Sequence, residues 1–268
     1  MSTHQDGRPL VFAHRGASAD VAEHTLAAYE RALDDGADGL ECDVRLTADG
    51  VLVCVHDRRV DRTSNGRGAV STLELADLAQ LDFQSWRPGD DDEAPDVVNH
   101  GSGSVLTLER LLELVRDTAR PVALAIETKH PTRYAGLVEQ RLFEVLDRFG
   151  LARPRLGDAT DVRVMSFSPV GLRRMRKLAP SLPRVLLMDR VPVRLRDGSL
   201  PPGIHVAGPS IEVVRAHPRY AQKVRAKGHR VYCWTVDEPD DVDRCVAAGV
   251  DAILTNRPRA VLDRLAAR

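Results

Sequence analysis

LVFAHRGAS, from Leu10 to Ser18, is the stretch that first indicates the fold and chemistry of this chain. Its opening residues are apolar, as in a buried strand, and the run ends abruptly at His14, Arg15 and Gly16. Gly16 permits a sharp turn or a close approach of the backbone. An imidazole that can move a proton and a guanidinium that can grip a phosphate or carboxylate therefore follow a core strand. For so short a motif, a strand with a basic turn remains the simpler interpretation.

Apolar runs of strand length alternate with amphipathic segments along the rest of the chain. The segment 25–35, for example, carries apolar residues at helical spacing. Besides the opening run, strands are predicted at 39–46, 51–56, 122–127, 162–167, 184–188, 203–207, 230–236 and 252–255. Helices are predicted at 25–35, 71–81, 107–118, 134–149 and 218–228, and from Ser168, Pro239 and Pro258 onward. A capping box of Ser71 and Glu74 is expected to open the helix at 71–81.

This alternation is typical of parallel βαβ units, and 268 residues suit a closed barrel, which commonly takes about 250. We therefore predict one α/β domain over 1–268, a TIM-type (β/α)8 barrel. The nine strand candidates exceed the eight strands of such a barrel. Either the strands flanking TADG at 47–50 form an additional hairpin, or 203–207 is irregular. An open doubly wound sheet is the alternative, but no GxGxxG loop follows a strand.

Composition narrows the class of partner and the compartment. The formal charge of −1 and the aromatic content of 4% disfavour nucleic acid as a partner. No apolar run approaches the roughly 20 residues that span a membrane, and the N-terminus lacks the features of a signal peptide. The four cysteines show no CxxC pairing and lie in or beside apolar segments, so reduced thiols are expected. We expect a soluble, cytoplasmic protein with no membrane partner, whose oligomeric state the sequence leaves open.

Reactive side chains gather at the predicted carboxyl ends of the strands. In a (β/α)8 barrel these ends face one shared cavity, where the chemistry takes place. Each charged residue alone can be explained as a solvated loop residue. The repeated occurrence of such residues at strand ends is not explained in this way and indicates a functional site. The residues at these ends are His14, Arg15, Glu41, Asp43, His56, Asp57, Glu127, Lys129, Ser166, Phe167 and Trp234.

Three carboxylates in this set indicate a metal site. Glu41 and Asp43 lie two residues apart and so on the same side of a strand, and Glu127 ends another strand. Without a cation, such a cluster would repel itself and raise its own pKa values. Donation by carboxylate oxygens alone suits Mg²⁺ or Ca²⁺ better than zinc. The sequence therefore predicts one divalent cation.

The remaining charged groups suit phosphoryl chemistry around that cation. Arg15 and Lys129 can neutralise phosphoryl charge. His14 and His56 can act on opposite sides as base and acid, one activating the nucleophile and the other protonating the leaving alkoxide. Two histidines in complementary protonation states predict a bell-shaped pH–rate profile.

In its motifs the chain resembles the glycerophosphodiester phosphodiesterase family, of the bacterial, cytoplasmic type. The similarity is collinear and spans nearly the whole chain. The shared motifs are HRG at 14–16, Glu23 and Thr25, ECDVRLTADG at 41–50, HD at 56–57, DRTSNGRG at 61–68, IETK at 126–129, SF at 166–167, WTV at 234–236 and GVDAILTN at 249–256.

The resemblance implies a barrel with a small insertion after the HD motif, at about 57–105. It also implies hydrolysis of small-molecule glycerophosphodiesters to sn-glycerol 3-phosphate and an alcohol, dependent on a divalent cation. The implied roles are metal binding by Glu41, Asp43 and Glu127, acid–base catalysis by His14 and His56, phosphate binding by Arg15 and Lys129, and contact with the glycerol by Trp234.

One position departs from the family pattern, because its Glu-Asn-Thr reads Glu23-His24-Thr25 here. Two other functions stay open: a lysophospholipase D or phosphoinositide-type phosphodiesterase on the same barrel, and a catalytically silent barrel that binds phosphorylated ligands. A lipid substrate would favour an apolar rim, and ligand binding alone would not need an acid–base pair. The sequence does not separate Mg²⁺ from Ca²⁺, direct water attack from a cyclic phosphate intermediate, or one leaving alcohol from another.

Overall fold

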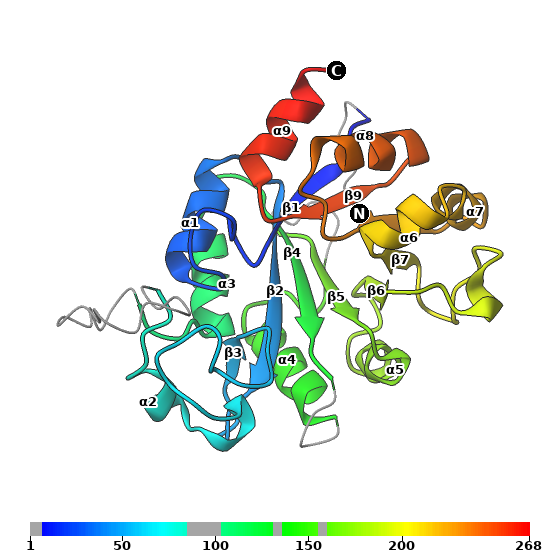
Figure 1. Ribbon diagram of the computed structural model, residues 1–268. Coiled ribbons are helices and arrows are strands. Elements are labelled where there is room, and N and C mark those ends of the chain that lie inside the picture. Colours follow the sequence, from blue (N-terminus) through cyan, green and yellow to red (C-terminus); the bar gives the residue numbers. More distant parts are fainter. Residues whose placement is uncertain (1–6, 85–102, 131–135, 155–159) are drawn as a thin grey trace.

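The computed structural model describes residues 7–84, 103–130, 136–154 and 160–268 (Figure 1). Eight parallel strands close a barrel, in the order β1, β9, β8, β7, β6, β5, β4, β2, with β2 pairing back to β1. The barrel strands are β1 (Leu10–His14), β2 (Gly39–Leu46), β4 (Ala123–Thr128), β5 (Val162–Ser166), β6 (Arg184–Met188), β7 (Val206–Pro209), β8 (Arg230–Cys233) and β9 (Ala252–Thr255). The predicted TIM-type barrel is therefore confirmed.

Helices connect successive strands on the outside of the barrel. They are α1 (Leu26–Asp34), α3 (Leu108–Asp117), α4 (Leu137–Arg148), α5 (Pro169–Leu178), α6 (Ile211–Ala216), α7 (Tyr220–Ala226), α8 (Pro239–Ala248) and α9 (Pro258–Ala266). Local sequence sets several of their starts. The Thr25 side chain accepts a hydrogen bond from the amide of Ala28, and Ser168 caps α5 ahead of Pro169. No helix of the described residues is long and apolar enough to cross a membrane.

The additional strand candidate belongs to a hairpin outside the barrel. Strand β3 (Leu52–Cys54) pairs antiparallel with β2, and the turn between them is closed by the amide of Thr47 and the carbonyl of Val51 at 3.0 Å. The other possibility, that 203–207 is irregular, is not needed to reach eight barrel strands, because a strand is present there with later bounds than predicted. Strand β7 begins at Val206, because residues 201–204 form a turn in which Ile204 donates to the carbonyl of Pro201.

The described residues that link β3 to α3 pack beside the barrel around an apolar cluster of their own, which consists of Val53, Val55, Val60, Val70, Leu78, Phe83 and Val105. The helix predicted at 71–81 is wrong in its start and length. A 3-10 turn (Val70–Thr72) precedes a short helix, α2 (Leu75–Leu78), which Glu74 and Asp77 cap. Of the insertion expected at 57–105, residues 85–102 lie outside the described part of the chain.

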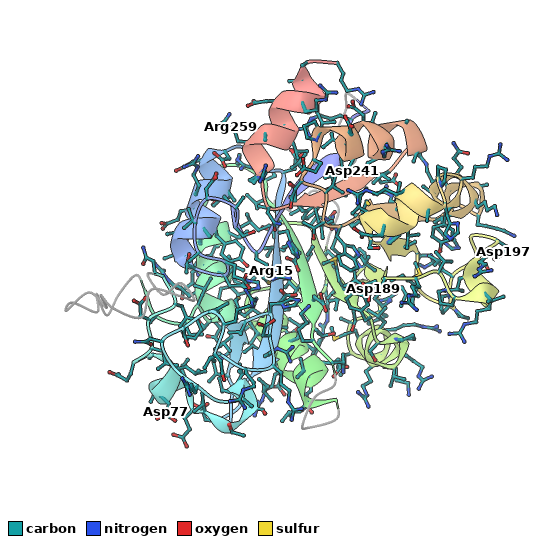
Figure 2. All side chains as sticks on the ribbon, in the orientation of Figure 1. Arg15, Asp77, Asp189, Asp197, Asp241 and Arg259 are labelled. Carbon is teal, nitrogen blue, oxygen red and sulfur yellow. The ribbon has the colours of Figure 1, made fainter. Side chains whose placement is uncertain are left out.

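The interior of the barrel is a packed core that supports the site above it. Side chains from seven strands form one inner cluster, which includes Phe12, Met165 and Tyr232. Two larger clusters fill the space between the strands and the outer helices. Most charged side chains point outward, as Asp77 and Asp197 do in Figure 2, whereas Arg15 lies at the centre of the molecule. The closed core leaves the carboxyl ends of the strands as the face where reactive groups meet.

Candidate active site

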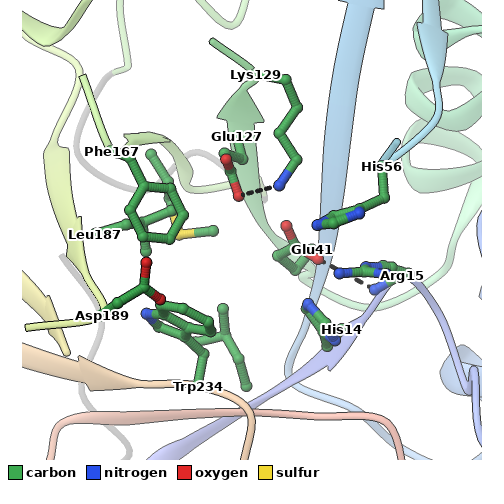
Figure 3. A pocket seen from close by; sticks show the side chains of 12 residues that line it. His14, Arg15, Glu41, His56, Glu127, Lys129, Phe167, Leu187, Asp189 and Trp234 are labelled. Carbon is green, nitrogen blue, oxygen red and sulfur yellow. Dashed lines mark hydrogen bonds and ion pairs between the residues drawn. The ribbon is translucent and has the colours of Figure 1, made fainter. Parts of the chain in front are cut away.

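A cavity of about 260 Å³ opens at the carboxyl ends of the barrel strands (Figure 3). All of the residues to which the sequence assigned a role line it except Asp43, which lies beside it on β2. Of the other strand-end residues, Phe167 lines the cavity, whereas Asp57 and Ser166 do not. The sequence did not single out Asp189, although it directly follows β6 and the strand-end argument applies to it equally. The lining residues are His14, Arg15, Glu41, His56, Glu127, Lys129, Met165, Phe167, Leu187, Asp189, Trp234 and Leu254.

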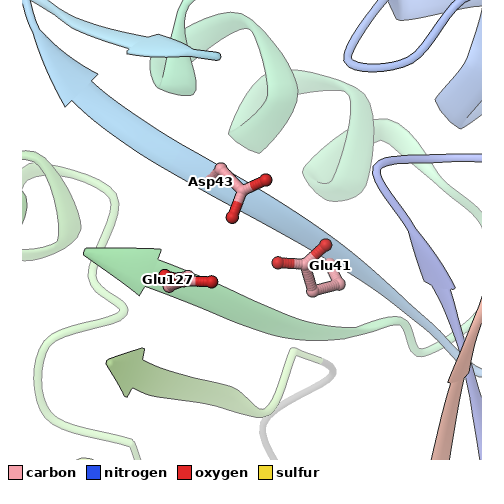
Figure 4. A group of neighbouring side chains, drawn as sticks. All are labelled: Glu41, Asp43 and Glu127. Carbon is pink, nitrogen blue, oxygen red and sulfur yellow. The ribbon is translucent and has the colours of Figure 1, made fainter. Parts of the chain in front are cut away.

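The three predicted metal ligands come together as expected (Figure 4). Glu41 and Asp43 project from the same side of β2, and the register of the sheet pairs Asp43 with Glu127 on β4. One carboxylate oxygen from each residue lies within 4.8 Å of the others. All three side chains are buried, with exposed fractions of 1%, 1% and 6%.

Burial and mutual repulsion govern the protonation of these acids. Burial, together with the neighbouring carboxylates, holds the pKa of Glu41 well above its usual range. Burial and the charge of Asp43 raise the pKa of Glu127 to about 8. Burial acts on Asp43 in the same direction, but a hydrogen bond from His24 and the charges of Lys129 and Arg15 hold its pKa well below its usual range. Without a cation, Asp43 is therefore the carboxylate that stays charged.

Two cations border the carboxylates. The Nζ atom of Lys129 lies 2.9 Å from Oε2 of Glu127 and 3.0 Å from Oδ1 of Asp43. The second contact has the distance of an ion pair but not hydrogen-bond geometry, so Asp43 Oδ1 has no hydrogen bond within the described residues. The Nε atom of Arg15 lies 3.2 Å from Oδ2 of Asp43. The cavity therefore holds both signs of charge within ion-pair distance.

The turn after β1 has an unusual backbone that directs Arg15 toward the acids. Arg15 adopts φ 60° and Gly16 φ 84°, both in the left-handed region. A Cβ atom at Gly16 would lie 2.7 Å from the backbone of Ala28, so only glycine fits there. The amide of Arg15 donates to Oε2 of Glu41 at 3.1 Å. The glycine of the HRG motif thus lets the chain turn tightly against α1.

Each of the two histidines has a different partner behind its ring. Nδ1 of His14 lies 2.7 Å from Oδ1 of Asn256, and Nδ1 of His56 lies 2.7 Å from Oδ1 of Asp57. These contacts leave Nε2 as the ring nitrogen available to the cavity in both residues. Burial, with the nearby charge of Arg15, lowers the pKa of His14 to about 4. Burial also lowers the pKa of His56, against the opposing effects of Asp43 and Asp57.

The wall opposite the carboxylates is aromatic. The rings of Phe167 and Trp234 meet edge to face, with centroids 5.4 Å apart. The indole Nε1 of Trp234 donates to the carbonyl of Gly208 at 2.7 Å, which fixes the ring. In Figure 3 the carboxylate of Asp189 lies next to this indole. This side of the cavity suits the carbon skeleton of a small polar ligand.

His24 occupies the position at which the family pattern has Asn, and it contacts a candidate metal ligand. Its Nε2 lies 2.9 Å from Oδ2 of Asp43, and its Nδ1 lies 2.8 Å from the hydroxyl of Tyr29. The ring is 6% exposed. The hydroxyl of Tyr29 donates its single proton to the carbonyl of Glu41 at 3.0 Å. A buried imidazole and a phenol therefore support β2 from behind the carboxylates.

The fold and this cavity define the class of the protein as a (β/α)8-barrel enzyme. Residues 14–260 match the model of the glycerophosphoryl diester phosphodiesterase family. The chain belongs to that family, which confirms the family and the enzyme class that the motifs predicted.

Individual relatives agree with this membership. A protein of Mycobacterium tuberculosis named probable glycerophosphodiester phosphodiesterase 1 is 49% identical over 252 residues, which cover 94% of this chain and 90% of that protein. A glycerophosphodiester phosphodiesterase of Caldanaerobacter subterraneus is 31% identical, over 96% of this chain and 97% of its own. A solved Oleispira antarctica phosphodiesterase, in complex with the product sn-glycerol-3-phosphate, matches with a TM-score of 0.80 and 24% identity, over 97% of this chain and 98% of that one. The last comparison shows the shared fold.

Proposed function

We propose that this chain hydrolyses glycerophosphodiesters to sn-glycerol 3-phosphate and an alcohol, with one divalent cation and with His14 and His56 as the acid–base pair. The observation that carries the proposal is the buried cluster of Glu41, Asp43 and Glu127, whose oxygens lie within 4.8 Å of one another beside a cavity lined by both histidines. Family membership supports the same reaction.

Glu41, Asp43 and Glu127 would hold the cation. The residues fit such a group, because all three are buried and Asp43 Oδ1 has no hydrogen bond among the described side chains. A donor set of carboxylate oxygens suits Mg²⁺ or Ca²⁺. When bound, such a cation supplies positive charge that polarises a phosphoryl oxygen.

Arg15 and Lys129 would bind the phosphate of the substrate. Both side chains line the cavity beside the carboxylates. Burial opposes the charge of Lys129, but Asp43 and Glu127 raise the pKa of its amine above the ordinary value. Fixed cations at this position stabilise the negative charge that develops on the phosphoryl oxygens during displacement.

The two histidines would move the protons. Because burial keeps the His14 ring neutral near pH 7, its Nε2 can accept the proton of the attacking oxygen. That oxygen belongs to water or to the neighbouring glycerol hydroxyl, and both routes need the same base. His56 would donate from Nε2 to the leaving alkoxide, and Asp57 at 2.7 Å from Nδ1 stabilises the charged ring. Trp234 and Phe167 would enclose the glycerol.

The direct test is release of glycerol 3-phosphate from glycerophosphocholine by the full chain. We expect turnover that is lost after complete chelation with EDTA and restored by Mg²⁺ or Ca²⁺ in excess. Separate titrations with each metal identify the cation that supports the higher kcat. Activity that survives complete chelation would contradict the role of the three carboxylates.

A second substrate separates the related activity. Lysophosphatidylcholine shares the glycerophosphocholine core but carries an acyl chain, whereas seven of the twelve side chains that line the cavity are charged or titratable. We therefore expect a much lower kcat/KM on lysophosphatidylcholine. A preference for it would instead identify a lysophospholipase D, and no product from either substrate would favour a silent ligand-binding barrel.

A further inference from the structure

We propose that Asn256 and Asp237 are positioning residues that hold His14 in the tautomer with its proton on Nδ1, so that Nε2 faces the cavity unprotonated. This inference rests on the proposed function, because it assigns the means by which the proposed base is prepared. Asn256 follows β9, and Asp237 lies between β8 and α8. Neither residue lines the cavity, so both act through His14.

Asp237 is an anchor that only accepts hydrogen bonds. Its Oδ1 accepts from the amide of Asn256 at 2.8 Å and from the hydroxyl of Thr255 at 2.9 Å. Its Oδ2 accepts from Nδ2 of Asn256 at 2.7 Å. Because an ionised carboxylate has no proton to give, the side-chain amide of Asn256 must present its NH2 group to Asp237.

The orientation of Asn256 then decides the tautomer of His14. With Nδ2 turned to Asp237, Oδ1 of Asn256 faces Nδ1 of His14 at 2.7 Å and the hydroxyl of Ser18 at 2.8 Å. A carbonyl oxygen can only accept, so Nδ1 of His14 carries the proton. In a neutral imidazole the other nitrogen, Nε2, is then the basic one. The carboxylate of Asp237 thus fixes the orientation of Asn256, and Asn256 fixes the tautomer of His14.

The second histidine shows that this arrangement is specific to His14. Nδ1 of His56 contacts the carboxylate of Asp57 directly, and no amide stands between them. A carboxylate in contact with imidazole stabilises the protonated ring, whereas a neutral amide fixes a tautomer without adding charge. The amide therefore suits a group that starts as a neutral base.

The decisive variant is Asp237→Asn, which keeps the shape and removes the charge. The new amide would present NH2 to Asn256, Asn256 would turn over, and its NH2 would face His14. Nδ1 would then accept a hydrogen bond and the proton would move to Nε2. We expect kcat on glycerophosphocholine to fall by about a hundredfold, with KM changed by less than about threefold, because a general base in the wrong tautomer cannot accept a proton.

The exchanged pair, Asp237→Asn with Asn256→Asp, provides the rescue. The carboxylate at 256 would accept from Nδ1 of His14, from Ser18 and from the amide at 237, so the Nδ1–H tautomer would return. We expect kcat to recover to within about fivefold of the wild-type value. A misplaced general base would instead leave a loss of about tenfold or more. The matched control is Asp251→Asn, which removes a carboxylate that accepts from the amide of Val231 at the other end of β8 and β9. This control should leave kcat unchanged.

A readout besides activity separates this inference from the proposed function. The imidazole nitrogen chemical shifts of His14, assigned by comparison with His14→Gln, report the tautomer directly. We expect Nδ1–H in the wild type and the exchanged pair, and Nε2–H in Asp237→Asn. The positioning role is overturned if Asp237→Asn keeps Nδ1–H or full kcat. It is equally overturned if the exchanged pair shows the same loss of kcat and of unfolding stability as Asp237→Asn. A wild type inactive on glycerophosphocholine would remove the function while leaving the tautomer measurement intact.

Discussion

At the carboxyl end of the barrel, three buried carboxylates lie within 4.8 Å of one another, whereas toward the amino end the buried guanidinium of Arg163 packs against the inner cluster. The Cζ atom of Arg163 lies 4.9 Å from the ring centroid of Phe12 and 5.5 Å from that of Tyr232. Its Nη2 donates to Asp161 at 2.6 Å. The lower charge is thus paired with a carboxylate and packed against two rings, while at the upper end mutual repulsion disfavours charge on more than one of the three acids.

This difference distinguishes the residues proposed to take part in the chemistry from residues that stabilise the fold. Like charges that are held together in a cavity destabilise the fold, and they persist where binding or catalysis uses them. The buried cation of Arg163 has a carboxylate partner and two aromatic faces, although its Nε and Nη1 have no hydrogen bond among the described residues. Substitutions of the site residues at the carboxyl end should therefore lower activity with little loss of stability. Substitutions at the amino end should lower stability with little loss of activity.

The largest effect is expected for the proposed base. We expect His14→Ala to lower kcat on glycerophosphocholine by at least about a hundredfold, because general acid–base groups contribute roughly that much or more. The urea midpoint should stay close to that of the wild type, since the ring is partly exposed to the cavity. Both quantities can be measured on the same preparation, by product release and by denaturant titration.

An exposed histidine near the amino end of the barrel provides the control for this variant. His205 directly precedes β7, and its ring contacts that of His229 with centroids 6.2 Å apart. We expect His205→Ala to change neither kcat nor the urea midpoint. Full turnover in His14→Ala, or an equal loss in both variants, would break the contrast between the two ends.

The sequence predicts the composition of the site better than its internal contacts. The strand-end argument located the acids, histidines and cations, because a parallel barrel brings these ends together. It could not give the register that pairs Asp43 with Glu127, which depends on hydrogen bonding between β2 and β4. The contact of His14 with Asn256 joins residues 242 positions apart and was also invisible. Spacing along one strand is local information, whereas partners behind a ring come from the whole fold.

The segment after β3 shows why a local helix signal can fail. Ser71 and Glu74 match a capping box, yet Leu73 between them adopts φ −109° and ψ 138°, which is extended. Its carbonyl accepts a hydrogen bond from the amide of Ala48 in the β2–β3 hairpin at 2.9 Å. This tertiary bond favours the extended conformation, so the helix begins only at Leu75. Propensity is a weak prior where a neighbouring element supplies a competing partner.

The second prediction tests the amino end. Asp161→Asn leaves the charge of Arg163 buried without its carboxylate. We expect the free energy of unfolding to fall by about 2 kcal/mol, less than the roughly 3–5 kcal/mol of a fully buried pair, because the side chain of Asp161 is 22% exposed. The kcat of the folded protein should stay within about twofold of the wild type, since distant sites act independently. Urea unfolding and initial rates measure the two quantities.

A double variant distinguishes lost charge pairing from lost packing. Asp161→Asn combined with Arg163→Met removes both charges and keeps an apolar side chain between the aromatic rings. We expect most of the lost stability to return, because replacing a buried pair by apolar residues is often neutral. A double variant as unstable as Asp161→Asn alone would show that the charge of Arg163 is not what destabilises the single variant.

The smallest effect concerns the rim of the carboxyl end, where Glu23 forms ion pairs with Arg62 at 2.8 Å and Arg15 at 3.2 Å. Burial acts to raise the pKa of Glu23, but the hydrogen bonds from Arg62 and the charge of Arg15 lower it to about 2. Because the folded pKa lies below the ordinary value of 4.5, this contribution to stability is present above pH 4.5 and is lost as the pH falls toward 2. We expect Glu23→Gln to lower the free energy of unfolding by about 1–2 kcal/mol at pH 7, after allowance for solvent screening.

The pH dependence of the stability lost in Glu23→Gln shows whether the charge of Glu23 or its packing stabilises the fold. Urea midpoints at pH 7, 5, 4 and 3 should show the difference between wild type and Glu23→Gln shrinking in the acid range, because protonated Glu23 no longer pairs with the arginines. Glu113→Gln, which removes an exposed partner of Arg110 on α3, should show little difference at any pH. A Glu23→Gln difference that stays constant down to pH 3 would mean that packing, and not ionisation, is lost. If it shrinks as expected, the ionised carboxylate of Glu23 stabilises the fold through its pairs with Arg62 and Arg15, in contrast to the crowded carboxylates of Glu41, Asp43 and Glu127.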